Sequence, residues 1–295
     1  MQHFYREKKK TGNSGHKHSS HKRNADRQQL LMENFRLRRK ERHRRLKTMK
    51  YDIGIVIPVY NATETVKELL RLLMELLAGY RWQVCLVDDH SDEEVFRYLS
   101  NQCLREEVSL IRLSQNCGQQ NAVLCGIRRL ADSCATLVTM DDDLQNPPQL
   151  LRPLINKIEE GYDLVYAVAD EKAQPFYRKL GSHLRNLFFT LVFHLPAGTR
   201  VSSYRIMTHQ LAKKIAAWDG NFFYFSAAAL RLNPKIANLR YPAEEKSFGN
   251  SGYSLRKLIT LYLNLVWNYG PLAKQKRGKK SGCPYTVQSI IEGVP

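Results

Sequence analysis

The chain has 295 residues, 43% of them hydrophobic, which suits one domain with extensions or two small domains, each with a real core. Its formal net charge of +18 is uneven: residues 1–50 hold 17 Lys/Arg against 4 Asp/Glu, and the remaining 245 residues hold 29 against 24. The composition excludes a secretory signal peptide in the polar first segment, and no apolar run approaches the roughly 20 residues of a membrane-spanning helix.

Residues 1–50 are expected to form a basic arm that is disordered or partly helical. Its cations cluster near the end, at Arg38, Arg39, Arg42, Arg44, Arg45 and Lys47. Such a run attracts anionic lipid or nucleic acid. The alternative is a solvated tail without a fixed role. The six cysteines form no CxxC pair, so we expect small apolar residues in a reducing compartment and not a disulfide framework.

Strands and helices alternate from residue 51 onward. Continuous apolar runs predict buried strands at 53–57, 83–87, 108–113, 136–140 and 164–168. Apolar residues at helical spacing predict helices from about Thr63 to Gly79, then at 93–104, 120–130 and 147–161. This order predicts an α/β fold with a doubly wound, mostly parallel sheet and helices on both faces.

The regular alternation ends after residue 170. We expect a short strand at 202–207 and a helix at 210–217, together with amphipathic helices at 182–195 and 253–268. One interpretation is that the two amphipathic helices lie in a membrane interface. The alternative is that they pack on the sheet as core helices or mediate dimers. The predicted domains are therefore the arm at 1–50, a catalytic domain at 51–238, and C-terminal interface helices with a basic tail at 239–295.

Acidic clusters follow two of the predicted strands, at the sheet edge where ligands bind in such folds. Asp141 and Asp143 point the same way if their strand persists, and Gln145 adds a neutral oxygen in that direction. Hard oxygen ligands of this kind suit Mg²⁺ or Mn²⁺, which can bridge a diphosphate. The alternative is a solvated acidic turn that caps the helix at Pro147.

The other cluster is Asp88-Asp89, at the end of the second predicted strand. A carboxylate there can accept a hydrogen bond from a nucleobase N–H or a ribose hydroxyl. The structural alternative is capping of the following helix, which Ser91 or Asp92 could provide alone.

Several motifs in consistent order resemble the family 2 glycosyltransferases of the GT-A fold. They are IPVYN at 57–61, VDDHS at 87–91, NCG at 116–118 and MDDDLQNPP at 140–148. Three later motifs resemble the polyprenyl-phosphate sugar transferase branch, which includes dolichol-phosphate mannosyltransferases and undecaprenyl-phosphate glycosyltransferases: PFYRKL at 175–180, SSYR at 202–205 and GNSGYS at 249–254. The resemblance covers about residues 51–270.

The resemblance implies a role for each matching residue. Donor-binding residues would be Pro58, Tyr60, Asn61, Asp88, Asp89, Gly118, Asp141 and Asp142, with Asp89 at the base. The metal ligands would be Asp141, Asp143 and Gln145. Catalytic roles would fall to Asp143, Arg178 and Arg205, and the acceptor phosphate would face Arg178, Arg205, Lys246 and Ser251. Cations of this kind suit an anionic acceptor.

The implied reaction is an inverting transfer of a sugar from a UDP- or GDP-linked donor to a polyprenyl phosphate, in cell-envelope polysaccharide biosynthesis. The enzyme would be cytoplasmic and peripheral, on the inner face of an anionic membrane. A homo-oligomer or a separate membrane subunit is open as a further partner. The sequence departs from the family at Ala62, where Glu is common, at Ala169 in place of Arg, and at Lys246 and Gly252 in place of Arg and Lys.

Two other functions compete with this interpretation. A soluble family 2 transferase acting on a polysaccharide or protein hydroxyl would need a general base, for which Asp170, Glu171 and Asp219 are candidates. A nucleic-acid binder would explain the basic arm, but the acidic clusters would repel phosphate in the absence of a metal. No nucleic-acid partner is therefore expected.

Overall fold

A computed structural model describes residues 49–170, 189–190, 192–193, 195–196, 198–242, 255–269 and 284–294. The chain divides into two compact units, Met1–Thr48 and Met49–Pro295, and all of the described residues belong to the second. Residues 1–48 of the predicted arm, most of the predicted helix at 182–195 and the site residues Arg178, Lys246 and Ser251 lie outside the described residues.

One sheet of eight strands organises the described part of the second unit, in the order β7-β5-β6-β4-β1-β2-β3-β8. The strands are β1 (Tyr51–Val59), β2 (Trp82–Asp88), β3 (Val108–Leu113), β4 (Cys134–Thr139), β5 (Leu164–Ala169), β6 (Arg205–Thr208), β7 (Ile236–Tyr241) and β8 (Val287–Ile291). β1 lies parallel to β2 and β4, and β2 to β3. β6 runs antiparallel between β4 and β5, and β8 runs antiparallel along β3.

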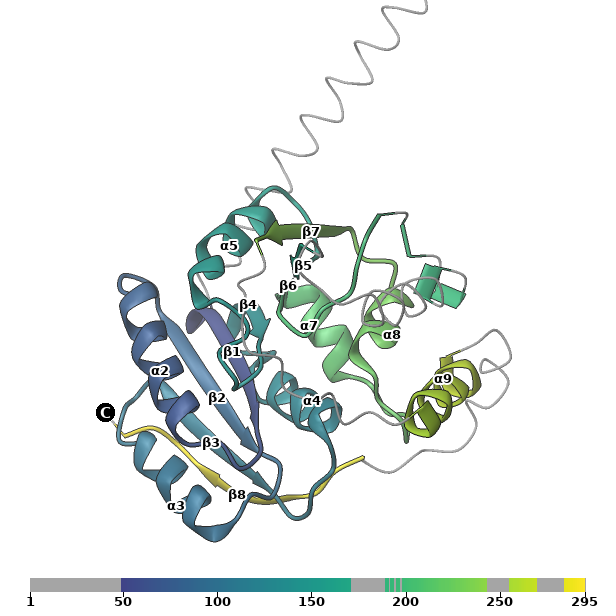
Figure 1. The fold of residues 1–295 in the computed structure, drawn as a ribbon. Helices are drawn as coiled ribbons and strands as arrows, with labels where there is room; N and C mark the ends of the chain where they lie inside the picture. The colour runs from purple at the N-terminus through teal and green to yellow at the C-terminus, as the bar shows by residue number, and fades with distance from the viewer. Residues whose placement is uncertain are drawn as a thin grey trace, which may run out of the picture. The chain divides into compact units, whose positions relative to one another are not determined.

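Helices cover both faces of this sheet (Figure 1). They are α2 (Glu64–Leu76), α3 (Glu93–Gln102), α4 (Gln119–Leu130), the 3-10 turn η1 (Pro148–Leu150), α5 (Leu151–Glu159), α7 (His209–Ala216), α8 (Phe225–Leu230) and α9 (Leu255–Tyr269). α2, α3 and α5 bury apolar side chains in one core cluster, whereas α4, α7, α8 and α9 bury theirs in a second cluster across the sheet. The predicted fold class is confirmed.

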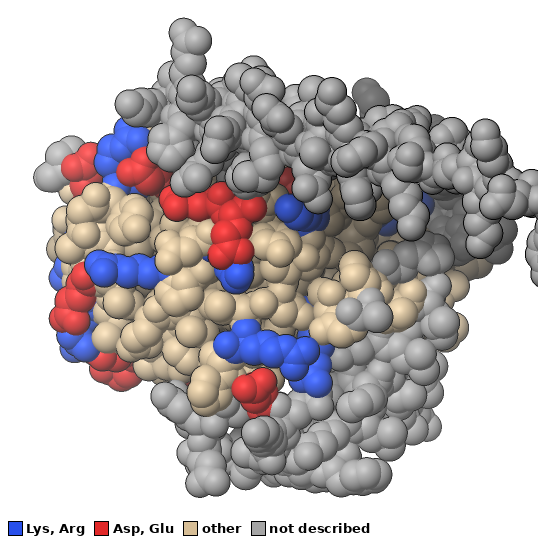
Figure 2. Space-filling model, turned by 90° about the horizontal axis from the view of Figure 1, so that it is seen from above, with Lys and Arg blue, Asp and Glu red and all other residues tan. Residues whose placement is uncertain are grey.

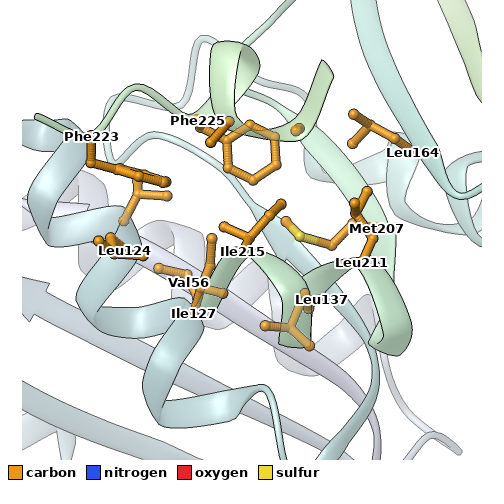
Figure 3. Packing of buried hydrophobic residues seen from close by; sticks show 14 of the residues in the cluster. Val56, Leu124, Ile127, Leu137, Leu164, Met207, Leu211, Ile215, Phe223 and Phe225 are labelled. Atoms are coloured by element: carbon orange, nitrogen blue, oxygen red, sulfur yellow. The ribbon is translucent and has the colours of Figure 1, made fainter. Parts of the chain in front are cut away.

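Close packing on the second face depends on a glycine in α4. Figure 3 shows Val56 of β1 against Ile127 of α4, with Ile215 of α7 and Phe225 of α8 closing the cluster above them. A Cβ on Gly126 would lie 2.3 Å from a methyl carbon of Val56, far inside normal contact. The absence of a side chain therefore lets α4 approach β1, which places the N-terminus of α4 at the carboxyl edge of the sheet.

Most elements up to residue 217 lie where the sequence predicts them, but three elements were missed. These are α8, β7 and β8. β7 spans residues 236–241, so the predicted boundary after residue 238 falls inside a strand, and β8 from the C-terminal segment adds to the main sheet. Of the five described cysteines, four are buried and Cys117 is half-buried. Within the described ranges, no helix has both the length and the apolar character needed to cross a bilayer.

Candidate active site

The loops that leave β1, β2 and β4 meet at one edge of the sheet. Val59 pairs with Asp88 in neighbouring strands, so the loops after them start side by side. The amide of Asn61 donates to Ser91 Oγ at 2.9 Å, and the amide of Asp92 donates to Asn61 Oδ1 at 2.9 Å. Cross-bonded loops of this kind hold their side chains in defined positions.

Backbone strain is concentrated at the same edge. Among the described residues, four other than glycine have a positive φ, and three of them follow these strands: Asn61 (52°), His90 (66°) and Leu144 (57°). Residues held in this region cost free energy and are enriched at ligand-binding sites. The strain supports a functional role for this edge of the sheet.

Asp88 has its side chain inside the protein, with 0% exposure. Its Oδ1 accepts a bond of 2.9 Å from the amide of Ser91, and its Oδ2 lies 3.6 Å from Arg112 Nε. Arg112 also donates to Glu93 Oε2 at 2.7 Å and to the carbonyl of Ser91 at 3.1 Å. Asp88 thus belongs to a buried network that holds the turn after β2.

Asp89 joins the end of β2 to the start of α4. Its two carboxylate oxygens accept bonds from the amides of Cys117, at 2.7 Å, and Gly118, at 2.8 Å. Gly118 has a φ of +84°, a conformation that L side chains rarely adopt. Burial raises the pKa of Asp89, and the two amide donors act in the opposite direction. Asp89 therefore clamps the loop that leads into α4, and carboxylate oxygens have room for further donors.

The acidic motif follows β4, which ends at Thr139. The strand ends before Asp141 and Asp143, so strand alternation does not set the directions of their side chains. Asp141 is half-buried, and its carboxylate accepts bonds from the side chains of Gln119, Asn146 and Ser203. Asp143 is exposed and accepts from the amide of Gln145 at 3.0 Å.

Asp142 lies between them and reaches the loop after β1, where it accepts from the amide of Tyr60 at 3.4 Å. Burial raises the pKa of Asp142 to about 6, and the charges of Asp143 and Asp141 add to the rise. The carboxylates of this motif therefore repel one another. A divalent cation would relieve that repulsion.

Within the described ranges, no group of three or more His, Cys, Asp or Glu side chains is placed to hold a metal by itself. A cation such as Mg²⁺ is commonly bound by one or two carboxylates and completed by water and substrate phosphate. Asp141 and Asp143 supply carboxylates, and the exposed Gln145 offers an amide oxygen. The chemistry of these donors fits a hard divalent ion that is shared with a phosphate ligand.

The remaining predicted residues are placed differently from one another. Pro58 is buried in β1, and Tyr60 is 54% exposed at the rim of the site. Arg205 is only 3% exposed, because it lies in β6 behind the acidic motif, and burial lowers its pKa to about 10. Arg178, Lys246 and Ser251 lie outside the described residues.

The sequence interpretation did not assign roles to three residues that contact Asp141. They are Gln119, Asn146 and Ser203. Asn146 and Ser203 lie within the quoted motifs LQNPP and SSYR, and Gln119 is the first residue of α4 after Gly118. Motif membership was the available signal, but only the fold brings the three side chains to one carboxylate.

A sheet whose central strands are parallel, with a carboxylate motif and clamped loops at its carboxyl edge, matches the GT-A arrangement that the sequence motifs predict. The family model described as glycosyl transferase family 2 matches residues 54–231. The chain belongs to this family, as its motifs predicted. It is therefore a glycosyltransferase.

A curated relative and two solved structures resemble the chain. It is 30% identical over 221 residues to an undecaprenyl-phosphate 4-deoxy-4-formamido-L-arabinose transferase of Enterobacter sp. (strain 638), covering 73% of this chain and 67% of the relative. The chain thus spans about two thirds of the length of the curated relatives that it matches.

The solved structures share the fold at low sequence identity. Glucosyl-3-phosphoglycerate synthase from Mycobacterium tuberculosis, in complex with Mn²⁺, UDP and phosphoglyceric acid, has a TM-score of 0.55 and 15% identity, with 82% of this chain and 90% of that chain covered. Mannosyl-3-phosphoglycerate synthase from Rubrobacter xylanophilus has a TM-score of 0.54 and 15% identity, with 86% and 90% covered.

Proposed function

We propose that the protein transfers a sugar from a nucleotide-sugar donor to a polyprenyl phosphate, with Mg²⁺ or Mn²⁺ as cofactor. The observation that carries the proposal is the acidic motif 141–143, held at the sheet edge beside the loop that Asp89 clamps. The similarity to a transferase named for undecaprenyl phosphate supports the acceptor class, and a fold neighbour with Mn²⁺ and UDP supports the cofactor and the donor nucleotide.

The donor would lie across the loops that leave β1, β2 and β4. Tyr60 exposes its ring and Asn61 braces the loop, so the nucleoside would bind here with Asp89 and Gly118 beneath it. The diphosphate would bind at Asp141, Asp143 and Gln145. A bound divalent ion supplies positive charge that offsets the charge developing on the leaving diphosphate.

The acceptor is the second part of the proposal. A phosphate oxygen is already ionised, so the enzyme needs no general base and must only align the acceptor behind the anomeric carbon. Arg178, Lys246 and Ser251 are proposed to bind this phosphate, and a single in-line displacement would invert the anomeric centre. The alternative acceptor is a hydroxyl of a polysaccharide or a protein, which would require a base such as Asp170 or Asp219.

Helix α9 is proposed to contact the membrane that holds the acceptor, on its cytoplasmic face. Leu265 and Tyr269 are buried against the protein, whereas Leu263 and Trp267 are 65% and 67% exposed, with Val266 beside them. α9 contains no acidic residue, and two cations stand near its start. An outward apolar face of this composition suits a lipid interface. A second copy of the chain or a separate membrane subunit would be alternative neighbours.

On the face shown in Figure 2, the described residues carry acidic and basic side chains interspersed, without a continuous basic surface among them. A protein that binds a nucleic-acid backbone would concentrate cations on one face. The described residues on this face offer no such concentration of cations.

Donor screening tests the proposal. The full chain is incubated with UDP- and GDP-sugars and Mn²⁺ or Mg²⁺, and nucleotide release is measured with and without a short prenyl phosphate. We expect release that depends on both the metal and the prenyl phosphate, and we expect Asp143→Ala to abolish it without loss of the folded state. Transfer of the sugar to a free sugar hydroxyl but not to prenyl phosphate would favour the alternative acceptor. Normal turnover by Asp143→Ala would refute the metal assignment.

A further inference from the structure

A buried cation lies directly behind the acidic motif. Arg205 faces Thr139 in the antiparallel pairing of β6 with β4. Its Nε donates to Thr139 Oγ1 at 2.8 Å, and its Nη1 donates to the carbonyl of Ser202 at 3.1 Å. The guanidinium carbon also lies 3.6 Å from the centre of the Phe225 ring. The guanidinium is therefore held by three groups inside the protein.

The hydrogen bonds continue from this guanidinium to the acidic motif. The hydroxyl of Thr139, which accepts from Arg205, donates in turn to the carbonyl of Ser203 at 2.8 Å. The hydroxyl of Ser203 then donates to Asp141 Oδ2. Thr139 and Ser203 thus connect a buried cation to a carboxylate that the proposed function assigns to the donor and its metal.

A buried charge costs free energy unless it is compensated, so its presence here needs a reason. With a pKa of about 10, Arg205 remains a cation at neutral pH, and the charge of Asp141 acts to raise that pKa. Arg205 is too buried to meet a phosphate at the site surface as its side chain lies in the structure. Its hydrogen bonds are instead directed at the backbone and hydroxyl that set the position of Ser203.

We propose that Arg205 is a positioning residue for Asp141, acting through Thr139 and Ser203 without touching the donor or the acceptor. By holding the segment 202–203 against β4, it keeps the hydroxyl of Ser203 on Asp141 Oδ2, which fixes the direction in which the carboxylate presents its other lone pairs. This inference rests on the proposed function for the role of Asp141. Groups that orient metal ligands in this way affect metal affinity or activity by about 10–100-fold when removed.

Substitutions of the two connecting residues test the inference, because replacing the buried arginine itself could prevent folding. Thr139→Val removes the hydroxyl that accepts from Arg205 and donates to Ser203, and Ser203→Ala removes only the last bond. Thr139→Ser is the matched control, since it keeps the hydroxyl. The measurement is Mn²⁺ affinity in the presence of saturating UDP, from the electron paramagnetic resonance signal of free Mn²⁺, together with UDP affinity in EDTA.

We expect Thr139→Val and Ser203→Ala to weaken Mn²⁺ binding about 10–100-fold, and Thr139→Ser to bind Mn²⁺ as the wild type does. In all three variants the metal-free UDP affinity should stay within about twofold of the wild-type value. Unchanged Mn²⁺ affinity in both variants would overturn the inference. So would a loss of UDP affinity in EDTA as large as the loss of Mn²⁺ affinity, or a wild-type chain that binds no Mn²⁺. If the expected Mn²⁺ pattern holds but no donor is turned over, the positioning role stands and the proposed function fails. If the wild type is active but neither variant changes Mn²⁺ affinity, the proposed function stands and the positioning role fails.

Discussion

Replacing Asp88 by asparagine should destabilise the protein more than it affects donor binding. The resemblance to the family places Asp88 among the donor-binding residues, but its carboxylate is buried between the amide of Ser91 and the guanidinium of Arg112. Asp88→Asn keeps an acceptor oxygen for Ser91, removes the charge, and places an amide NH2 group, itself a donor, in the position that faces Arg112. Arg112 then retains Glu93, whose side chain is largely exposed, as its remaining carboxylate partner.

The expected loss in the free energy of unfolding follows from these contacts of Asp88. Removing one partner of a buried ion pair costs about 3–5 kcal/mol, because the other charge is left uncompensated. Glu93 still compensates Arg112 in part, and the Asp88–Arg112 separation of 3.6 Å is long, so we place Asp88→Asn at about 2–3 kcal/mol. Asp88→Ala also leaves the amide of Ser91 without its acceptor, so its loss of stability should reach about 3–5 kcal/mol. The asparagine variant should lower Tm by roughly 4–10 °C.

Urea unfolding of the full chain measures the stability change, and titration with UDP and Mn²⁺ measures binding. Asp92→Asn is the control: it changes an exposed acid four residues away that makes no side-chain cap bond, and it should shift stability by less than about 1 kcal/mol. The double variant with Arg112→Met should show a coupling of about 1–3 kcal/mol. Wild-type stability combined with lost UDP binding in Asp88→Asn would refute the reasoning, because Asp88 would then contact the donor directly.

Three further substitutions test the packing and the proposed membrane face. Gly126→Ala should destabilise the protein by about 1–3 kcal/mol in urea unfolding, since the added carbon would meet Val56, and an unchanged midpoint would contradict this packing. Gly293→Ala would bring a carbon within 2.2 Å of a backbone oxygen, so amide exchange along β8 should accelerate; retained protection would disprove the constraint. Replacing Leu263 and Trp267 together by serine should weaken sedimentation with anionic vesicles roughly tenfold, and equal binding would remove α9 from the interface.

Local patterns predicted the central strands well because each is a continuous apolar run. The expected strand at 108–113 is β3 to the residue, and 164–168 is β5 less one residue. β7 and β8 escaped prediction for the opposite reason. Their residues are half-buried or exposed at the two edges of the sheet, so neither strand produces a strong hydrophobic signal.

The acidic motif was predicted as a site from its place after a buried strand, and the structure brings it to the expected edge of the sheet. Its supporting contacts could not be predicted. Gln119 and Ser203 reach Asp141 from positions 22 and 62 residues away in the chain. Spacing arguments apply within one strand or one helix, and the strand in question stops at Thr139, before the motif begins.

Family membership, the order of strands and helices as far as β5, and the acidic motif all follow from the sequence, because each depends on residues close together in the chain. The burial of Arg205 and the network around Asp88 depend on which strands become neighbours. β6 inserts antiparallel between β4 and β5, which turns a cation expected at the surface of the site into one held behind it. Strand pairing is a long-range choice made by the packing of the whole sheet, so only the tertiary structure could assign these two residues to the inside of the protein.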